Sequence, residues 1–272
     1  MTTDTVADDP YCRRFAGRVA VVPGSSANPS IGRSCATRLG REGASVVING
    51  RDPSTLSATE RDLRALGIEA VAVAGSMDDG ATPARLVEVA IEHFGRIDHL
   101  VNTIGGAHFA GSFEQMDKAG LIDTVALNTW PTLALIQAAL AGGLADGGGS
   151  VVNISSGSPH KTTSSMVAYA AAKAALNALT RTIAADLGPR GVRVNAVSPG
   201  LTKTSGTRAI WENDEGRDAG AKLVLGRLTA ADDIAAAAAF LLSDDARQIT
   251  GVLLDVDGGN HLSGGWSPFR SA

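Results

Sequence analysis

The chain has 272 residues, of which 44% are hydrophobic and 19% charged, and its formal net charge is −4. This is an ordinary globular composition, and the length is typical of one α/β domain. The acidic balance and the lack of any Lys/Arg run exclude a protein that binds duplex nucleic acid by neutralising its phosphates. The longest apolar run, residues 234–242, is well short of the roughly 20 residues needed to cross a bilayer.

The N-terminal residues and the cysteines indicate where the protein works. Asp4, Asp8 and Asp9 precede any apolar stretch, which is the wrong chemistry for a secretory signal. Cys12 and Cys35 lie far apart in sequence and predict two unpaired thiols in a reducing compartment, since nothing else supports a disulfide or a metal site. We therefore expect a soluble cytoplasmic protein that binds neither nucleic acid nor membrane and holds no metal.

Residues 1–16 are polar and aperiodic, which predicts a flexible arm. After them, short β-branched segments alternate with segments of helical period. Several of these segments are almost wholly apolar, as strands covered on both faces are. The predicted strands are residues 18–22, 45–49, 69–74, 97–102, 150–154, 192–197 and 251–256.

The segments between these strands have helical patterns with recognisable ends. Asp52 before a proline is typical of an N-cap, and Gly95 of a C-terminal cap. Two later helices are predicted over residues 113–140 and 165–187, the second unusually rich in alanine. The alternation predicts one catalytic domain, residues 17–272, built on a doubly wound parallel sheet of about seven strands with helices on both faces.

The turn after the first strand runs from Pro23 to Gly32 and leads into the first helix. Glycines at such a turn let backbone N–H groups and the positive helix end face a bound pyrophosphate. The usual Gly-x-Gly-x-x-Gly string is absent, so the loop alone is equally compatible with an ordinary turn. Its place in the first β-α unit favours a dinucleotide, because ligands of such sheets bind at the carboxyl ends of the strands.

The end of the second strand indicates which dinucleotide is bound. The stretch Asn49-Gly50-Arg51-Asp52 has no carboxylate where the strand ends, and a guanidinium follows. A carboxylate would repel a 2′-phosphate, whereas Arg51 would bind one with charge-assisted hydrogen bonds. This favours NADP(H) over NAD(H); the alternative interpretations are a solvated loop cation and, for Asp52, a helix cap. Arg33 is a second candidate phosphate contact.

The segment around Tyr169 carries the residues of greatest chemical interest. Tyr169 and Lys173 are four residues apart, so they share one face of a helix, and Ser156 ends a predicted strand that can meet this face. Only five of the 24 Lys and Arg residues are lysines, and the only other tyrosine, Tyr11, lies in the arm. This pairing favours a catalytic role; the alternative is a packed tyrosine hydroxyl beside a surface lysine.

Together these motifs resemble the short-chain dehydrogenase/reductase family over residues 17–260. Several such motifs in the same order are specific to the family. Besides the glycine loop and the Tyr-x-x-x-Lys pair, the resemblance rests on Asn102 to Gly106, Asn128, Ser156, Val194 to Gly200, and Thr250 to Gly259.

The resemblance implies hydride transfer between a nicotinamide and a carbonyl or alcohol, with Tyr169 as general acid/base. Lys173 would lower the phenol pKa from about 10 and hold the nicotinamide ribose. Ser156 would orient the substrate oxygen, and Asn128 would hold a water in a proton relay unless it caps a local kink. The implied cofactor-binding residues are Gly24, Ser26, Ser30, Ile31, Gly32, Arg51, Ser76, Asn102, Gly105, Tyr169, Lys173, Pro199, Gly200, Thr202 and Thr204.

Departures from the family pattern lie on the cofactor side. The longer loop resembles that of divergent enoyl-thioester reductases, whose Tyr–Lys spacing is wider, so that activity is an alternative. A non-catalytic dinucleotide-sensing regulator is a second alternative, which the intact Ser, Tyr and Lys argue against. The departures are Pro23 for threonine, two extra residues between Gly24 and Gly32, Ser30 for glycine, Gly75-Ser76 where an aspartate is usual, and Thr103-Ile104 for Asn-Ala.

Residues 201–227 are polar and weakly periodic and match the family's substrate lid. Trp211 either stacks on the substrate or packs against its own helix, and His108 with Phe109 either lines the pocket or belongs to an ordinary loop. The family forms dimers or tetramers through two long helices, which the alanine-rich helix suits, so we expect a homo-oligomer. The sequence defines the substrate only as a small ketone or secondary alcohol.

Overall fold

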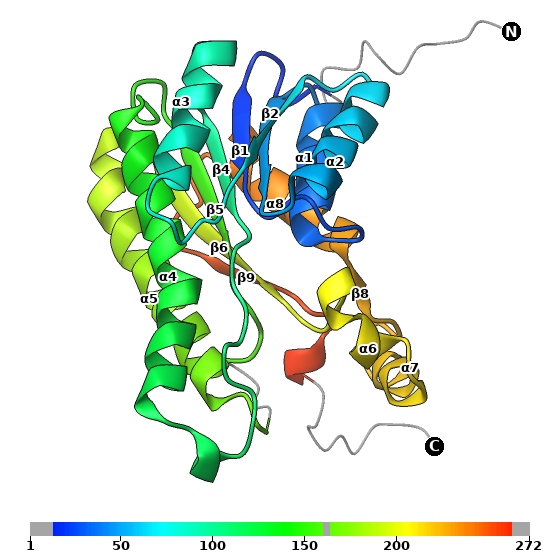
Figure 1. Cartoon of the computed structure of the whole chain (residues 1–272). Coiled ribbons are helices and arrows are strands. Elements are labelled where there is room, and N and C mark those ends of the chain that lie inside the picture. The colour runs from blue at the N-terminus through cyan, green and yellow to red at the C-terminus, as the bar shows by residue number, and fades with distance from the viewer. Residues whose placement is uncertain (1–12, 160–163, 263–272) are drawn as a thin grey trace, which may run out of the picture.

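Seven parallel strands form one sheet in the order β3-β2-β1-β4-β5-β6-β9 in a computed structural model, which describes residues 13–159 and 164–262. Helices cover both faces of the sheet (Figure 1), so the predicted doubly wound α/β fold is confirmed. The strands are β1 (Val19–Val22), β2 (Ser45–Gly50), β3 (Ala70–Ala74), β4 (His99–Asn102), β5 (Ser150–Ile154), β6 (Arg193–Pro199) and β9 (Leu253–Val256).

Two apolar layers enclose the sheet. Along β1, Ala20 and Val22 pack with α1, α2 and α8, whereas Val19 and Val21 pack with α3, α4 and α5. Both faces of the strands are therefore buried, which explains their near-continuous apolar sequences. The helices are α1 (Ile31–Arg41), α2 (Pro53–Ala65), α3 (Thr82–Phe94), α4 (Lys118–Ala141), α5 (Val167–Leu187) and α8 (Ala231–Leu242).

The element boundaries agree with the sequence except at the start of α4. Each main strand ends within two residues of its prediction. The helix predicted over residues 113–140 is wrong at its start: Phe113–Gln115 is a separate 3₁₀ turn, and α4 begins at Lys118. Asp117 sets this start, because its side chain accepts a hydrogen bond from the Gly120 N–H at 2.8 Å.

The described end of the predicted N-terminal arm is packed against the body of the protein. Phe15 is only 1% exposed, and its N–H donates to the Glu42 carbonyl at 2.9 Å. Arg14 forms an ion pair with the Glu42 carboxylate at 2.7 Å. The rest of the arm, residues 1–12, lies outside the described residues.

Helix α4 is long and apolar enough, by length and composition, to cross a membrane. It lies against the sheet beside α3 and α5 (Figure 1), and Leu135 and Ile136 belong to the core. The core helix of a soluble protein meets the same criterion, so this helix is weak evidence for a membrane span.

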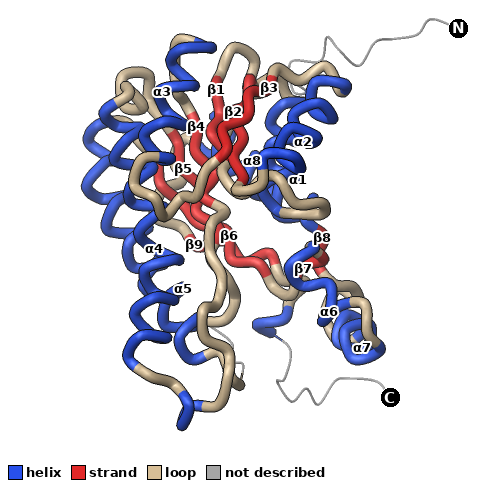
Figure 2. Tube along the Cα trace, viewed as in Figure 1, coloured by secondary structure: helices blue, strands red, loops and turns tan. Residues whose placement is uncertain are grey.

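The predicted lid leaves the body after β6. Two short parallel strands, β7 (Thr202–Lys203) and β8 (Thr229–Ala230), pair at its base and were not predicted. Between them lie α6 (Arg208–Trp211) and α7 (Asp214–Ala221), which project away from the sheet (Figure 2). The lid is thus a helical segment whose two ends are held together by the pairing of β7 with β8.

Candidate active site

The carboxyl ends of β1 and β4 form the centre of the candidate site. The chain runs outward in opposite directions from these two neighbouring strands, and such a switch point leaves a crevice where ligands bind. The Thr103 hydroxyl after β4 donates to the Pro23 carbonyl after β1 at 2.5 Å. A Cβ on Gly24, whose φ is +69°, would lie 2.6 Å from that hydroxyl oxygen, so only glycine fits here.

The glycine loop brings the start of α1 close to β1. A Cβ on Gly32 would lie 2.5 Å from the Gly24 carbonyl oxygen, which explains why residue 32 is glycine. Ser30 is the N-cap of α1 and accepts from the Arg33 N–H at 3.1 Å. Its backbone is extended, with φ −147°, so the glycine usual in the family is not required. Ile31 then opens the helix, and its first amide groups have no partner within the helix.

Ser26 lies against the end of β2. A Cβ on Gly50 would come within 2.5 Å of the Ser26 Oγ, so the loop and the strand touch only because residue 50 is glycine. Arg51 follows with an exposed side chain. Asp52 accepts from the Ser54 N–H at 2.8 Å and caps α2, as one interpretation of the sequence had it.

Arg33 is held by α2. Its Nη1 donates to the Thr59 hydroxyl at 3.1 Å, and its Nη2 pairs with the Asp62 carboxylate at 2.5 Å. Arg33 thus has protein partners on α2, and its role as a second phosphate contact stays a prediction.

Asn49 positions the loop after β3 and was missed by the sequence analysis. Its buried Nδ2 donates to the Val73 carbonyl at 2.9 Å and to the Gly75 carbonyl at 3.1 Å. This fixes the loop that carries half-buried Ser76 after β3, the strand that pairs with β2 on the side away from the switch point. The signal was a lone polar residue inside an apolar strand.

Ser156, Tyr169 and Lys173 come together as the sequence predicted. Ser156, just after β5, is close enough to the Tyr169 phenol to lower its pKa. Ser156 Oγ also lies 3.0 Å from the Ser158 hydroxyl. One turn along α5, Lys173 Nζ donates to the Ile154 carbonyl at 2.9 Å.

The pKa values of the pair differ from the prediction in one respect. Lys173 is 3% exposed, and its burial lowers the pKa of the ammonium to about 8. Burial raises the pKa of the Tyr169 phenol, against a smaller lowering by Ser156, so the predicted lowered pKa is wrong for this structure. Lys173 Nζ lies 5.7 Å from the centre of the phenol ring and donates its hydrogen bond to the Ile154 carbonyl instead of the phenol. The phenol therefore keeps its proton at neutral pH.

Asn128 anchors the loop after β4. Its buried Nδ2 donates to the Gly106 and Thr124 carbonyls, each at 2.7 Å, and its Oδ1 accepts from the Gly106 N–H at 3.2 Å. A Cβ on Gly105 would lie 2.5 Å from Asn128 Oδ1 and 2.9 Å from Lys173 Nζ. The loop, α4 and α5 thus meet at Gly105, where only glycine leaves room.

Asn102 supports the site from within the sheet. Its Nδ2 donates to Asn153 Oδ1 at 2.8 Å, and Asn153 Nδ2 donates to the Thr180 hydroxyl at 2.9 Å. This buried chain of hydrogen bonds links β4, β5 and α5, so it fixes the helix that carries Tyr169.

The remaining predicted cofactor residues lie where β6 leads into the lid. Pro199 ends β6, and the Gly200 N–H donates to the Val256 carbonyl at 3.2 Å. Buried Thr202 donates from its hydroxyl to the Gly200 carbonyl at 3.0 Å. The indole N–H of Trp211 donates to the Thr204 carbonyl at 2.9 Å, so Trp211 is bound within the lid.

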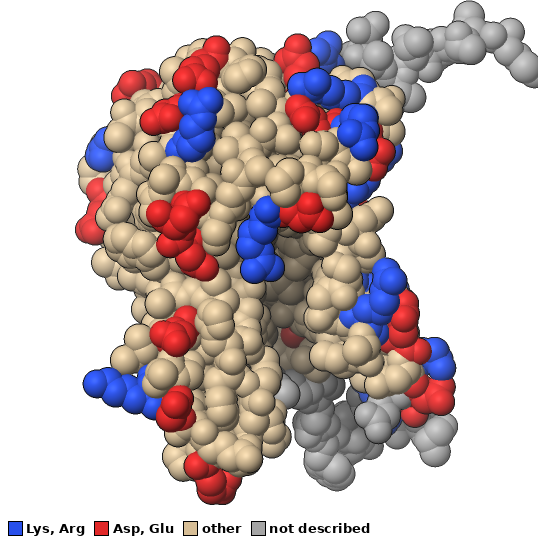
Figure 3. Space-filling model, viewed as in Figure 1, with Lys and Arg blue, Asp and Glu red and all other residues tan. Residues whose placement is uncertain are grey.

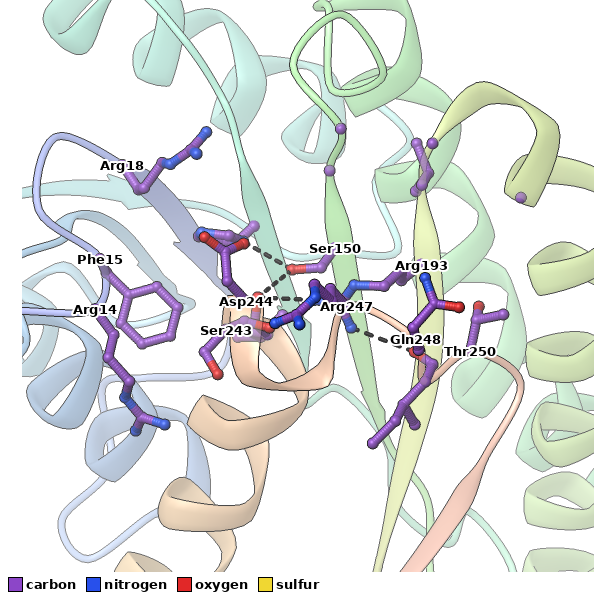
Figure 4. A pocket seen from close by; sticks show the side chains of 18 residues that line it. Arg14, Phe15, Arg18, Ser150, Arg193, Ser243, Asp244, Arg247, Gln248 and Thr250 are labelled. Carbon is purple, nitrogen blue, oxygen red and sulfur yellow. Dashed lines mark hydrogen bonds between the residues drawn. The ribbon is translucent and has the colours of Figure 1, made fainter. Parts of the chain in front are cut away.

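The surface is hollowed between the side formed by α4 and α5 and the side formed by the lid helices (Figure 3). A different depression, of about 410 Å³, lies at the amino ends of β4, β5 and β6, away from Ser156 and Tyr169 (Figure 4). Arg18 there pairs with Asp98 at 3.0 Å, and Arg193 donates to backbone carbonyls at the end of α8. These arginines hold the sheet and helix together, so this depression is structural.

The fold and the site define a dinucleotide-binding α/β oxidoreductase with a Ser-Tyr-Lys cluster. A family model described as enoyl-(acyl carrier protein) reductase matches residues 24–261. An uncharacterized oxidoreductase of Methylorubrum extorquens is 37% identical over 249 residues, which cover 90% of this chain and 98% of that protein. A 2,5-dichloro-2,5-cyclohexadiene-1,4-diol dehydrogenase of Sphingobium indicum is 34% identical, with 90% and 97% covered.

A solved structure of a short-chain type dehydrogenase/reductase from Mycobacterium ulcerans superposes with a TM-score of 0.86 at 34% identity, over 92% of this chain and 91% of that one. The chain belongs to the short-chain dehydrogenase/reductase family. Members of this family are oxidoreductases that use NAD(P)(H) and act on small molecules.

Proposed function

We propose that this protein is an NADP(H)-dependent oxidoreductase that interconverts a ketone and a secondary alcohol, with Tyr169 transferring the proton. The observation that carries the proposal is the placement of Ser156 beside the Tyr169 phenol, with buried Lys173 one turn away. We also propose that the protein has a single catalytic domain, in which residues 201–227 form a substrate lid. We propose that it works in the cytoplasm.

The loops at the switch point fit a dinucleotide. Gly24, Gly32 and Gly105 let these loops pack closely against α1, α4 and α5, and α1 begins directly after the loop that follows β1. We assign the pyrophosphate to this loop and helix end. Arg51 directly follows β2 with an exposed side chain, so its guanidinium is available for a 2′-phosphate. None of the residues of β2 is a carboxylate that would repel this phosphate. When bound, NADP(H) would donate or accept the hydride.

The side chains of the cluster would bind and protonate the substrate oxygen. Ser156 is placed to hydrogen-bond that oxygen and orient the carbonyl. Tyr169 keeps its proton at neutral pH because burial raises its pKa, so it can donate to the oxygen as negative charge develops. Lys173 supplies a buried positive charge one turn away, and Asn128 holds the Gly105 loop against it.

The substrate class follows from the spacing of the cluster and from a relative. The Sphingobium enzyme is named for dehydrogenation of a cyclic diol, which supports a secondary alcohol or ketone here. An enoyl-thioester reductase is the second candidate, favoured by the name of the matching family model and by the longer glycine loop. The single-turn spacing of Tyr169 and Lys173 favours carbonyl chemistry.

A homo-oligomer is the proposed assembly. Ile122 and Trp130, on one face of α4, are 50% and 52% exposed. Exposed alanines, residues 171, 174 and 178, follow each other along neighbouring α5. Large apolar side chains beside a flat small-residue surface suit a helix-to-helix contact between two copies. Light scattering at micromolar concentration tests this, and a monomer would contradict it.

The decisive experiment is a fluorescence titration with NADPH and NADH, followed by assays on ketones and on an enoyl thioester with wild type and Tyr169→Phe. We expect tighter NADPH binding, ketone reduction by the wild type, and a loss of at least about a hundredfold in Tyr169→Phe. Tighter NADH binding contradicts the role of Arg51. Ketone reduction that survives the Phe substitution contradicts the proton donor, and enoyl reduction alone favours the second candidate.

A further inference from the structure

The lengthened glycine loop touches the start of the lid. The Pro29 carbonyl accepts a hydrogen bond from the Ser205 N–H at 2.8 Å. Pro29 lies in the stretch between Gly24 and Gly32 that is two residues longer than the family pattern. Ser205 is the first residue of the 3₁₀ turn Ser205–Thr207, where the chain passes from β7 into the lid.

On the loop side, both ends of the extended stretch are fixed. Ser25 is fully buried; its hydroxyl donates to the Val22 carbonyl at 2.6 Å, and its N–H donates to the Asn49 carbonyl at 2.8 Å. Ser30 is fixed as the N-cap of α1. The residues between them are exposed or half-buried, so they project from a rigid base toward the lid.

On the lid side, the first turn behaves as one unit. The Thr207 hydroxyl donates to the Thr202 carbonyl at 2.5 Å, and the Trp211 indole donates to the Thr204 carbonyl at 2.9 Å. Thr202 is buried and paired with Thr229 in the β7-β8 ribbon. A contact at Ser205 therefore fixes the whole entrance of the lid.

We propose that the Pro29–Ser205 hydrogen bond is a clasp that holds the lid entrance in its cofactor-binding position before the cofactor arrives. This rests on the proposed function, which assigns the pyrophosphate to the loop, and on the expectation that Thr202 and Thr204 belong to the cofactor-binding residues. The clasp joins these two groups of residues directly. Without the clasp, a smaller fraction of the free protein would have the glycine loop and the lid entrance in their cofactor-binding positions. The apparent Kd would rise in proportion to the loss of this binding-competent population.

The substitution Ser205→Pro removes the N–H donor and little else. Proline is favoured at the first position of a helical turn. The preceding Thr204 is extended, with φ −131° and ψ 167°, which is the conformation that a following proline requires. Ser205→Ala is the matched control, because it removes the hydroxyl and keeps the N–H. Deleting Ala27 and Asn28, which are exposed, is a second variant that withdraws the acceptor from the loop side.

Two measurements are made on the full-length protein: the Kd of NADPH by fluorescence, and amide hydrogen exchange over residues 202–222 without cofactor. For Ser205→Pro and the deletion we expect a Kd between about twofold and tenfold higher than for Ser205→Ala, the range that loss of one backbone hydrogen bond allows. We also expect faster exchange in the lid entrance. Equal Kd and equal exchange in Ser205→Pro and Ser205→Ala would overturn the clasp.

The exchange measurement separates failure of the clasp from failure of the proposed function. If no protein binds NADPH or NADH, the proposed function fails, while faster exchange in Ser205→Pro still establishes that the bond orders the lid. If all proteins bind NADPH equally and only exchange differs, the bond orders the lid but does not prepare the cofactor site, and the proposal is refuted.

Discussion

Lys173 is a buried ammonium, and its cost to stability can be measured. Its pKa is about 8, against an ordinary value of 10.5, because burial disfavours the charged form. At pH values between these two pKa values, the unfolded chain binds more protons than the folded protein, so the free energy of unfolding rises with pH. At about 1.4 kcal/mol per pKa unit, the ammonium costs about 3 kcal/mol at pH 7.

Lys173→Met keeps the length of the side chain and removes the charge. Between pH 7 and pH 9 the wild type should recover about 1 kcal/mol of its penalty, whereas the variant has none to recover. The difference in free energy of unfolding between the two proteins, measured by urea denaturation, should therefore change by about 1 kcal/mol over this range. The same substitution at exposed Lys222 is the control.

If the difference in free energy of unfolding between wild type and Lys173→Met stays constant from pH 7 to pH 9, the burial of a charged lysine is refuted. The variant should also lose activity by at least about a hundredfold, the usual contribution of a residue that supports proton transfer. A more stable but inactive Lys173→Met protein would place this residue among those that trade stability for function.

Three further predictions concern residues outside the cluster. Burial lowers the pKa of His99 to about 4, so acidification from pH 7 to pH 5 should cost the wild type about 2 kcal/mol of stability that His99→Asn does not lose, as measured by urea denaturation. Burial raises the pKa of the Cys35 thiol to about 12, so iodoacetamide at pH 8 should modify it only in urea, as peptide mass spectrometry would detect. Gly32→Ala should weaken NADPH binding by about tenfold in a fluorescence titration, because its Cβ meets the Gly24 carbonyl.

The strands and the Tyr169–Lys173 pair were predictable because their signals are local. A strand buried on both faces is apolar along its length, and a four-residue spacing places two side chains on one helix face whatever surrounds them. Asp52 was recognised as a possible cap for the same reason, since the cap and the amide it accepts from are two residues apart.

What the sequence could not predict depends on contacts between distant segments. Asn128 is bonded to Gly106 on the loop after β4, and burial of Phe15 depends on β4 and the end of α1. The pKa of Tyr169 was predicted with the wrong sign because the sequence shows the neighbouring lysine but not the burial that outweighs it. The sequence likewise revealed a longer glycine loop but not that it reaches Ser205.

The raised pKa of Tyr169 predicts different pH profiles for the two directions of the reaction. Ketone reduction needs the phenol, which is present throughout the neutral range, so its rate should be flat from about pH 6 to pH 8. Alcohol oxidation needs the phenolate, whose population rises with pH below a raised pKa, so its rate should increase across the same range. Initial rates at saturating cofactor would measure both profiles. An oxidation rate that is flat in this range would mean that bound cofactor lowers the phenol pKa below neutrality, or that another group takes the proton. Tyr169→Phe distinguishes these outcomes, because only the second leaves oxidation intact.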